Sequence, residues 1–327
     1  MKFAIYGAGA IGAYMGAKLS VAGQDVALIA RGPHLAAMQE RGVVVRSPDG
    51  DFSASVFATS DAAEVGHADV VVLAVKAHGL TAIAPLLRPL LGPDTVVLPA
   101  QNGIPWWYFQ RHGGAWEGTR LESVDPGGVI TEHVPAESIV GCVVYPAATI
   151  VEPGVIEHEE GNRFSLGELD GTTSERAKEI SAALGSAGLR APVRANIRQE
   201  IWVKLMGNLA FNPISALTQA GMAEIAQDPD AAGVARAMMG EAYSVATALG
   251  VEIPISVDQR MAGAEKVGDH KTSMLQDVEL ARPIEIGGLV GVVLELGRLV
   301  GVPMPTTSAV YACAKLLGAK TLAAAGR

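Results

Sequence analysis

The sequence predicts an α/β protein in two parts, a Rossmann-type dinucleotide-binding domain at residues 1–195 and an all-α domain at residues 196–327. A glycine-rich turn near the N-terminus separates a strand-like apolar run from a helical pattern. Continuous apolar runs, typical of parallel strands buried on both faces, recur along the first part. From Asn196 onward the pattern is helical without a convincing strand, so we expect helices to form the second part.

The composition narrows the class of protein. The chain has 327 residues, enough for two domains, and 49% of them are apolar. A net charge of −9 without a basic block argues against binding to nucleic acid or to an anionic membrane. No apolar stretch reaches the roughly 18 residues of a membrane span, and Cys142 and Cys313 lack metal-ligand spacing. We therefore expect a soluble, cytoplasmic protein without a metal site.

The N-terminal turn has the GxGxxG pattern in the context that dinucleotide binding requires. The strand-like run Lys2–Tyr6 precedes it, a helical pattern through Ala22 follows, and Asp25–Ala30 reads as a second strand. The first glycine allows a tight turn, the second lets the backbone approach a pyrophosphate, and the third lets helix and strand pack closely. The predicted cofactor-binding residues here are Gly7, Ala8, Gly9, Ala10, Ile11 and Gly12.

The end of the second strand distinguishes the two nicotinamide cofactors. An acidic residue there would bind the ribose 2′-hydroxyl of NAD, but the strand runs into Ala30, Arg31 and Gly32. A guanidinium can pair bidentately with a 2′-phosphate. Arg31 therefore favours NADP(H), with an ordinary solvated loop residue as the alternative.

Two buried strands, Ala68–Val75 and Thr95–Pro99, are followed by polar residues at their carboxyl ends. Ligands of open parallel sheets bind beyond these ends. Lys76 and Asn102 are therefore candidate ligand-binding residues, although either could be a plain cap or turn residue.

Shorter elements fill the rest of the first part. We expect strands at 42–46, 52–57, 141–145, 155–159, 163–167 and 190–193 and a helix at 173–188. The strands between 141 and 167 are expected to extend the sheet with antiparallel pairs.

The segment 105–135 gathers five of the chain's 16 aromatic residues among several glycines. These are Trp106, Trp107, Tyr108, Phe109 and Trp116. A lid or pocket wall, a dimer contact, or the packing of a local hairpin would each explain them. The sequence leaves these three alternatives open.

The first helix of the second part, 196–218, carries a narrow polar stripe. Its polar residues between 201 and 217 are Lys204, Asn208, Asn212 and Ser215, which fall within roughly 80° at about 100° per residue. On a helix otherwise suited to burial, such a stripe is costly unless a polar group lies against it. A bound molecule with a carboxylate and a carbonyl would fit, and a satisfied polar seam or a solvent edge are the alternatives. Pro213 should kink this helix.

Further helices are expected at 221–227, 230–249, 255–267, 283–300 and 306–323. Between them, Ser273 by itself could be a helix N-cap. Glu285 would lie in the first turn of a helix that begins at Pro283, where it could complement the helix dipole.

Together these motifs resemble the ketopantoate reductase (2-dehydropantoate 2-reductase) family along the whole chain. The matching elements are GAGAIG at 7–12, Arg31, Lys76 in LAVKA, QNG at 101–103, the helix with Lys204, Asn208, Asn212 and Pro213, and SMLQD at 273–277 with Glu285. The last two are far more specific than the glycine motif. The resemblance implies reduction of the C2 carbonyl of 2-dehydropantoate by NADPH, which gives (R)-pantoate for pantothenate and coenzyme A synthesis.

The resemblance also implies roles for individual residues. Lys204 would be the catalytic proton donor, since an ammonium can stabilise and protonate a developing oxyanion. Glu285, if close, would keep that lysine charged and oriented. The implied substrate-binding residues are Asn208, Asn212, Ser273 and Asn102. The implied cofactor contacts, besides the glycine turn and Arg31, are Lys76, Asn102, Ala147 and Glu285.

Two departures from the family pattern keep other functions open. The aromatic segment is longer than in simple members, and Met222 stands where some members have a substrate-binding Asn. A bulkier or more apolar 2-oxo acid is therefore an alternative substrate. A 3-hydroxyacid dehydrogenase fits less well because of Ser273, Glu285 and the QNG motif. A non-catalytic NADP sensor would not need a proton donor. The expected partner is a small 2-oxo acid, and a homodimer is an open option.

Overall fold

The computed structural model describes residues 1–268 and 270–326 and contains two compact units. Unit 1 comprises Met1–Gln101, Trp106–Arg120 and Gly127–Ile197. Unit 2 comprises Asn102–Pro105, Leu121–Pro126 and Arg198–Arg327. Within the described residues, no helix combines the length and the apolar character needed to cross a bilayer.

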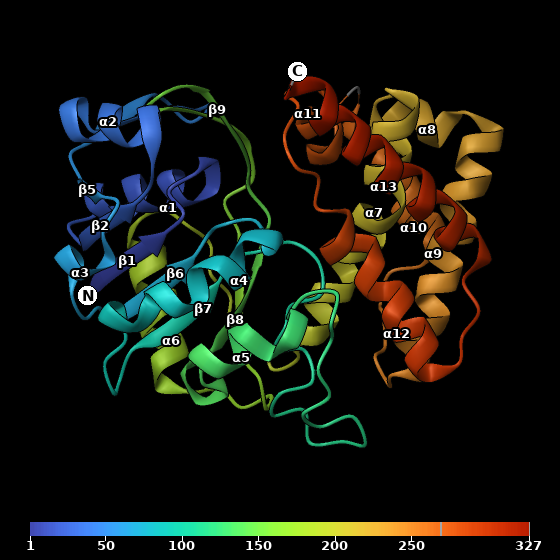
Figure 1. Cartoon of the computed structure of the whole chain (residues 1–327), viewed down its shortest axis with the longest axis horizontal. Coiled ribbons are helices and arrows are strands. Elements are labelled where there is room, and N and C mark those ends of the chain that lie inside the picture. Colours follow the sequence, from blue (N-terminus) through green and yellow to red (C-terminus); the bar gives the residue numbers. More distant parts are fainter. Residues whose placement is uncertain (269, 327) are drawn as a thin grey trace. The chain divides into compact units, whose positions relative to one another are not determined.

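Unit 1 is organised around a parallel sheet with the strand order β5-β2-β1-β6-β7, drawn in blue to teal in Figure 1. The first strand lies at its centre and pairs in parallel with β2 and β6. The strands are β1 (Lys2–Tyr6), β2 (Asp25–Ile29), β5 (Phe57–Thr59), β6 (Val70–Leu73) and β7 (Val96–Pro99). This order and direction confirm the predicted Rossmann-type fold.

Short helices connect these strands, as the parallel pairing requires. They are α1 (Ala10–Val21), α2 (Gly32–Arg41), α3 (Ala62–Val65), η1 (Ala77–Gly79), α4 (Leu80–Ile83) and η2 (Ala84–Leu90). Helix α1 packs closely on the sheet at Gly16. A Cβ added there would lie 2.5 Å from Leu28 Cδ2 and 3.0 Å from Ile5 Cδ1, so a larger residue would not fit. Phe3, Ile5 and Leu28 are fully buried beneath it, so the core of unit 1 holds the glycine turn in place.

Two smaller sheets complete unit 1 and correct two predictions. One has the order β4-β3-β10-β9 and the other pairs β11 with β8. Their strands are β3 (Val43–Arg46), β4 (Phe52–Ala54), β8 (Val140–Val144), β9 (Ala147–Glu152), β10 (Val155–Glu160) and β11 (Phe164–Glu168). The expected strand at 52–57 is two strands, β4 beside β3 and β5 beside β2. The strands after residue 140 form these separate sheets and do not extend the parallel one, because apolar alternation specifies a face but not a partner.

The aromatic segment is packed inside unit 1. Trp106, Trp107, Tyr108 and Phe109 are each at most 2% exposed, and Trp107 packs so closely on β8 that a Cβ at Gly141 would lie 2.8 Å from its ring. Local packing therefore accounts for these four aromatics, and an exposed lid does not. The remaining helices after this segment are η3 (Pro126–Gly128), α5 (Val129–His133), η4 (Ala136–Ser138) and α6 (Glu175–Ser186).

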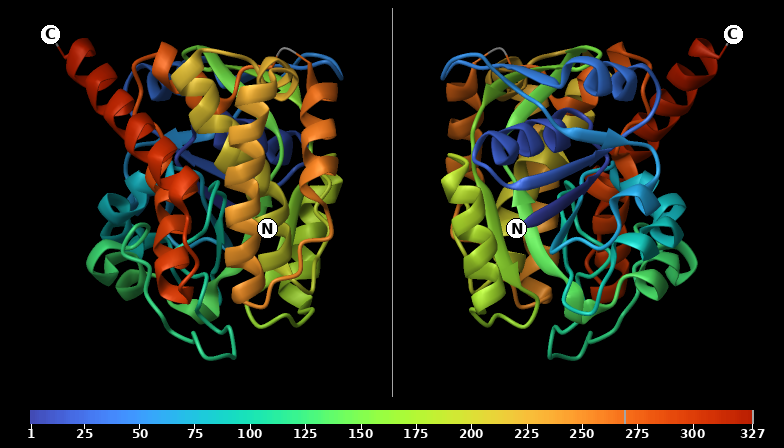
Figure 2. Two further views of the ribbon diagram at one scale, coloured as in Figure 1. Left: turned by 90° about the vertical axis from the view of Figure 1, so that its right-hand side faces the viewer. Right: turned by 90° about the vertical axis from the view of Figure 1, so that its left-hand side faces the viewer.

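The part of unit 2 that begins at Arg198 contains helices and no strand among its described residues, as the sequence predicted, and is drawn in yellow to red in Figures 1 and 2. Its helices are α7 (Ile197–Thr218, whose first residue belongs to unit 1), α8 (Met222–Gln227), α9 (Pro229–Ala248), α10 (Val257–Val267), α11 (Ser273–Glu279), the π-helical η5 (Gly287–Gly291), α12 (Val292–Val300) and α13 (Pro305–Ala325). Helix α11 was not predicted. Helix α7 continues past Pro213 to Thr218.

Two short segments from the first half of the chain pack into unit 2. Gly103 has a φ of +89°, and a Cβ there would lie 2.1 Å from Gly288 O. The neighbouring Ile104 N–H donates to the same oxygen at 3.2 Å. The carboxylate of Glu295 accepts from the N–H groups of Glu122 and Ser123 at 2.8 and 2.9 Å. These contacts hold Asn102 in the same unit as α7.

Candidate functional site

The glycine turn is tied to the end of β2. The N–H groups of Gly7 and Ala8 both donate to Ile29 O at 3.0 Å. Gly7 has a φ of +98°, and a Cβ there would lie 2.6 Å from Val75 N, so only glycine fits. The hydrogen bond from the Ala8 N–H therefore helps to fix the shape of the turn.

The start of α1 leaves room for a phosphate. A Cβ at Gly9 would meet no atom within 4 Å, whereas one at Gly12 would lie 2.4 Å from Gly7 O. Gly12 therefore sets the close packing and Gly9 faces open space. The first helical bond runs from Ala13 N to Gly9 O. The N–H groups of Ala10, Ile11 and Gly12 precede this bond, at the helix N-terminus where backbone N–H groups can bind an anionic group such as a phosphate.

Arg31 lies just past β2, at the N-cap position of α2, and is exposed. Its guanidinium acts on Tyr6, the last residue of β1. Burial raises the pKa of the Tyr6 hydroxyl, and the positive charge of Arg31 opposes that rise. Arg31 thus supplies an exposed cation directly after β2, and its predicted contact with a 2′-phosphate stays a prediction.

The residues after β6 and β7 fall into different units. Lys76 is in unit 1, at the N-cap of η1, and Asn102 is in unit 2. Between them in sequence, the Gln101 amide donates to Val75 O at 3.2 Å and also to Leu73 O. Sequence reasoning noted Gln101 only as part of QNG, but its side chain secures the carboxyl end of β6.

Ala147 opens β9, a strand that packs against α1. It pairs with Glu160 across the β9–β10 hairpin and is half-buried. Its predicted contact with the cofactor stays a prediction.

Three polar side chains of the stripe predicted on α7 have different hydrogen-bond partners in the structure. Lys204 Nζ donates to Asn102 Oδ1 at 2.6 Å. Asn212 is 5% exposed, and its Nδ2 lies 3.5 Å from Ser273 Oγ. Ser215 is satisfied locally, since its hydroxyl donates to Ala220 O at 2.7 Å. The amide oxygen of Asn102 orients the Lys204 ammonium, and an ammonium is a group that can stabilise an oxyanion.

The structure corrects the local geometry predicted for two residues. Thr272, not Ser273, is the N-cap of α11, since its hydroxyl accepts from Leu275 N. Ser273 is therefore the first helical residue. Glu285 precedes the helix that starts at Ile286 and is not in its first turn, because the first bond runs from Leu289 N to Glu285 O. The catalytic and cofactor roles predicted for Glu285 stay predictions.

Sequence reasoning missed Arg260 on α10. Its guanidinium lies against α7, with Nη2 3.5 Å from Lys204 O. A Cβ at Gly207 would lie 2.3 Å from the same nitrogen. A glycine in the interior of an otherwise regular helix was the available signal, because such a glycine often marks a close approach.

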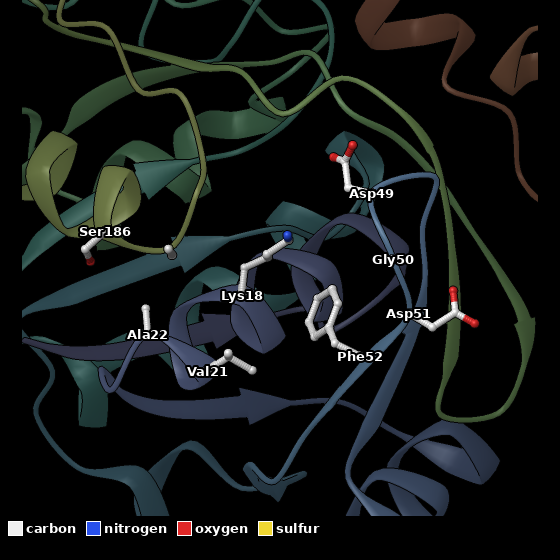
Figure 3. Close-up of a pocket in the computed structure, with 9 residues that line it drawn as sticks. Lys18, Val21, Ala22, Asp49, Gly50, Asp51, Phe52 and Ser186 are labelled. Atoms are coloured by element: carbon white, nitrogen blue, oxygen red, sulfur yellow. The ribbon is translucent and has the colours of Figure 1, made fainter.

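Two cavities in unit 1 lie away from the predicted residues. One of about 430 Å³ is beside the C-terminal half of α1, where Lys18 lies over the Phe52 ring with Nζ 4.8 Å from its centroid (Figure 3). The glycine turn precedes the other end of α1, on the order of 15 Å away at 1.5 Å per residue, so this cavity is not the phosphate site. A second cavity of about 600 Å³ is lined by the segment that includes Trp106, Arg111 and Arg120.

Comparisons with known proteins identify the family of this chain. The C-terminal domain model of the ketopantoate reductases PanE/ApbA matches residues 196–318, and the model of their first domain matches residues 3–106. The chain is 52% identical over 318 residues to a 2-dehydropantoate 2-reductase of Mesorhizobium japonicum, covering 97% of this chain and 98% of the relative. This chain belongs to the ketopantoate reductase family. The resemblance inferred from the sequence is confirmed, and the chain is an oxidoreductase of this type.

Solved structures agree. A crystal structure from Ralstonia solanacearum assigned as a ketopantoate reductase is 41% identical, with a TM-score of 0.93 and 98% coverage of both chains. D-mandelate dehydrogenase in complex with NADH and anilino(oxo)acetate is 25% identical, with a TM-score of 0.84 over 98% of this chain and 99% of that one. The ketopantoate reductase fold thus also occurs in a dehydrogenase of another 2-hydroxy acid.

Proposed function

We propose that this protein reduces 2-dehydropantoate to (R)-pantoate with NADPH. The observation that carries the proposal is the 2.6 Å hydrogen bond from Lys204 Nζ to Asn102 Oδ1, on a helix whose other polar groups include Asn208 and Asn212. The 52% identity to a 2-dehydropantoate 2-reductase supports the choice of substrate. The domain boundary near residues 195 and 196 is part of the same proposal, with the cofactor held by the first domain and the substrate by the second.

Lys204 is the proton donor in this proposal. Reduction of a ketone places negative charge on its oxygen, which an adjacent ammonium stabilises and then protonates. Asn102 restricts the ammonium to one direction and acts as its positioning residue. Asn208, Asn212 and Ser273 supply amide and hydroxyl groups for the polar end of the substrate.

The residues of unit 1 fit NADP(H). Gly9 leaves space for the pyrophosphate, the first N–H groups of α1 supply donors, and Arg31 supplies a cation for the 2′-phosphate. When bound, NADPH supplies the hydride for the substrate carbonyl. Lys76, Ala147 and Glu285 complete the proposed set of cofactor contacts.

Replacing Arg31 by alanine is expected to weaken NADPH binding selectively. Losing hydrogen bonds to a charged phosphate should raise KM for NADPH about 10- to 100-fold, while KM for NADH changes less than about threefold. Steady-state kinetics with both cofactors measure this. Arg46→Ala, an exposed arginine of the same unit, should change neither value. Equal losses with NADPH and NADH would exclude a contact between Arg31 and the 2′-phosphate, and no loss with either would assign Arg31 to the solvated surface.

A bulkier 2-oxo acid is the alternative substrate. The similarity to D-mandelate dehydrogenase with anilino(oxo)acetate favours it, as does Met222 at the start of α8, where some family members have an Asn. The test compares kcat/KM for 2-dehydropantoate with that for a panel of aliphatic and aromatic 2-oxo acids. The proposal expects 2-dehydropantoate to be the best substrate, and a higher value for an aromatic acid would replace it.

A non-catalytic NADP sensor is the remaining alternative from a different class. It would bind NADPH but would not oxidise it with any acid of the panel.

Homodimerisation and a cytoplasmic location stay predictions. The apolar side chains that α13 exposes, Leu316 and Leu322 among them, support a homodimer, and the sedimentation of the purified protein would test it.

A further inference from the structure

The assigned residues of unit 2 supply one cation to a substrate that carries one negative charge and develops a second. A 2-oxo acid brings one negative charge on its carboxylate, and reduction builds a second on the carbonyl oxygen. The assigned group of Lys204, Asn102, Asn208, Asn212 and Ser273 contains one cation, which the proposed mechanism uses at the carbonyl. A carboxylate taken out of water without a cationic partner is costly.

Arg260 of α10 places a second cation against α7, the helix that carries Lys204. Its Nη2 lies 3.5 Å from Lys204 O, at the outer limit of a hydrogen bond, and its side chain is half-buried. One contact of this guanidinium is therefore with the backbone of the turn that carries Lys204 and Asn208.

Gly207 makes this position available. A Cβ at residue 207 would lie 2.3 Å from Arg260 Nη2, 2.7 Å from Nε and 2.9 Å from Cζ. Three atoms of the guanidinium thus cover the place where a side chain of α7 would stand. Glycine inside a helix is less favourable than alanine, so α7 gives up stability at the residue that admits this cation.

We propose that Arg260 binds the carboxylate of the 2-oxo acid substrate, an inference that rests on the function proposed above. A guanidinium pairs with a carboxylate through two parallel N–H···O bonds. Such a pair would leave the Lys204 ammonium for the carbonyl oxygen and would fix which end of the substrate lies toward α10. The competing explanation is a purely structural contact between α10 and α7.

The test compares a 2-oxo acid with its neutral primary amide. The ratio of kcat/KM for the acid to that for the amide does not depend on the fraction of folded enzyme. In Arg260→Gln this ratio should fall about 10- to 100-fold, the loss of a charge-assisted hydrogen bond, while KM for NADPH changes less than about threefold. Arg260→Lys should keep part of the preference, because it keeps the charge but not the fork.

The variant Gly207→Ala distinguishes an effect on substrate binding from an effect on the stability of the protein. Its methyl group would displace the guanidinium from α7, while alanine has a higher helix propensity than glycine. We expect a midpoint of thermal unfolding equal to or above that of the wild type, together with a lower acid-to-amide ratio. Acid and amide affected equally in both variants would overturn the carboxylate assignment and leave Arg260 a structural contact. A wild-type enzyme that reduces no 2-oxo acid would instead remove the proposed function, on which this inference rests.

Discussion

Replacing Lys204 by alanine is expected to lower kcat with 2-dehydropantoate about 10³-fold, within the range for loss of a general acid. The reason is the absence of the ammonium that Asn102 holds at 2.6 Å. The Kd for NADPH should stay within about threefold of the wild-type value, because Lys204 belongs to unit 2 and the glycine turn to unit 1. Steady-state turnover and fluorescence titration with NADPH measure the two quantities.

Two further variants sharpen this prediction. Lys320→Ala removes an exposed lysine of α13 and should leave kcat unchanged. Asn102→Ala removes the acceptor but keeps the ammonium, so it should lower kcat less than Lys204→Ala does. Full turnover in Lys204→Ala would contradict the assignment of the proton donor, whatever the result for Asn102.

Replacing Glu168 by alanine is expected to destabilise unit 1 by about 3 kcal/mol, as for other broken buried ion pairs. The Glu168 side chain is 3% exposed and accepts from Arg176 Nε and Nη2 at 2.7 and 2.6 Å and from Ser174 Oγ at 2.5 Å. The mutation would leave the Arg176 guanidinium, which is 31% exposed, without its carboxylate. Differential scanning calorimetry measures the shift. Glu175→Ala, which breaks the exposed pair with Lys178, should cost less than about 1 kcal/mol.

The same carboxylate makes stability depend on pH in a defined direction. Burial acts to raise the pKa of Glu168, but the hydrogen bonds from Arg176 and Ser174 outweigh it and hold the pKa below its usual 4.5. The unfolded chain therefore binds this proton at a higher pH than the folded chain does. The contribution of Glu168 is fully present above pH 4.5 and is lost as the pH falls through the lower folded value. Glu168→Gln should show a flatter decline of Tm with falling pH, and an identical decline would exclude this carboxylate as the cause.

The fold was predictable where one local pattern has one structural meaning. The glycine turn, the strands around it and the long helix α7 follow from apolar periodicity and from residues that only certain turns accept. Strand pairing did not follow. Residues 52–57 alternate like one strand, yet Phe52–Ala54 and Phe57–Thr59 belong to different sheets, because partner choice is made by contacts distant in sequence.

The candidate site was predictable from the residues that carry chemistry and less so from those that position them. The helical spacing of Lys204, Asn208 and Asn212 placed them on one face, the end of a buried strand indicated Asn102, and family resemblance supplied the role of Ser273. Arg260 was not predicted as a site residue because an arginine on an amphipathic helix is usually solvated. Its significance depends on Gly207, a residue on another helix, and only the folded chain brings the two together.

The most direct test of the proposed reduction of 2-dehydropantoate measures the product that the wild-type enzyme forms. Purified protein is incubated with 2-dehydropantoate and a limiting amount of NADPH, and pantoate is quantified by chiral chromatography beside the loss of NADPH absorbance. The account predicts one molecule of (R)-pantoate for each NADPH oxidised. NADPH that stays reduced would contradict the proposed reduction, and pantoate formed without preference for the R enantiomer would contradict a site that presents one face of the bound carbonyl to the hydride.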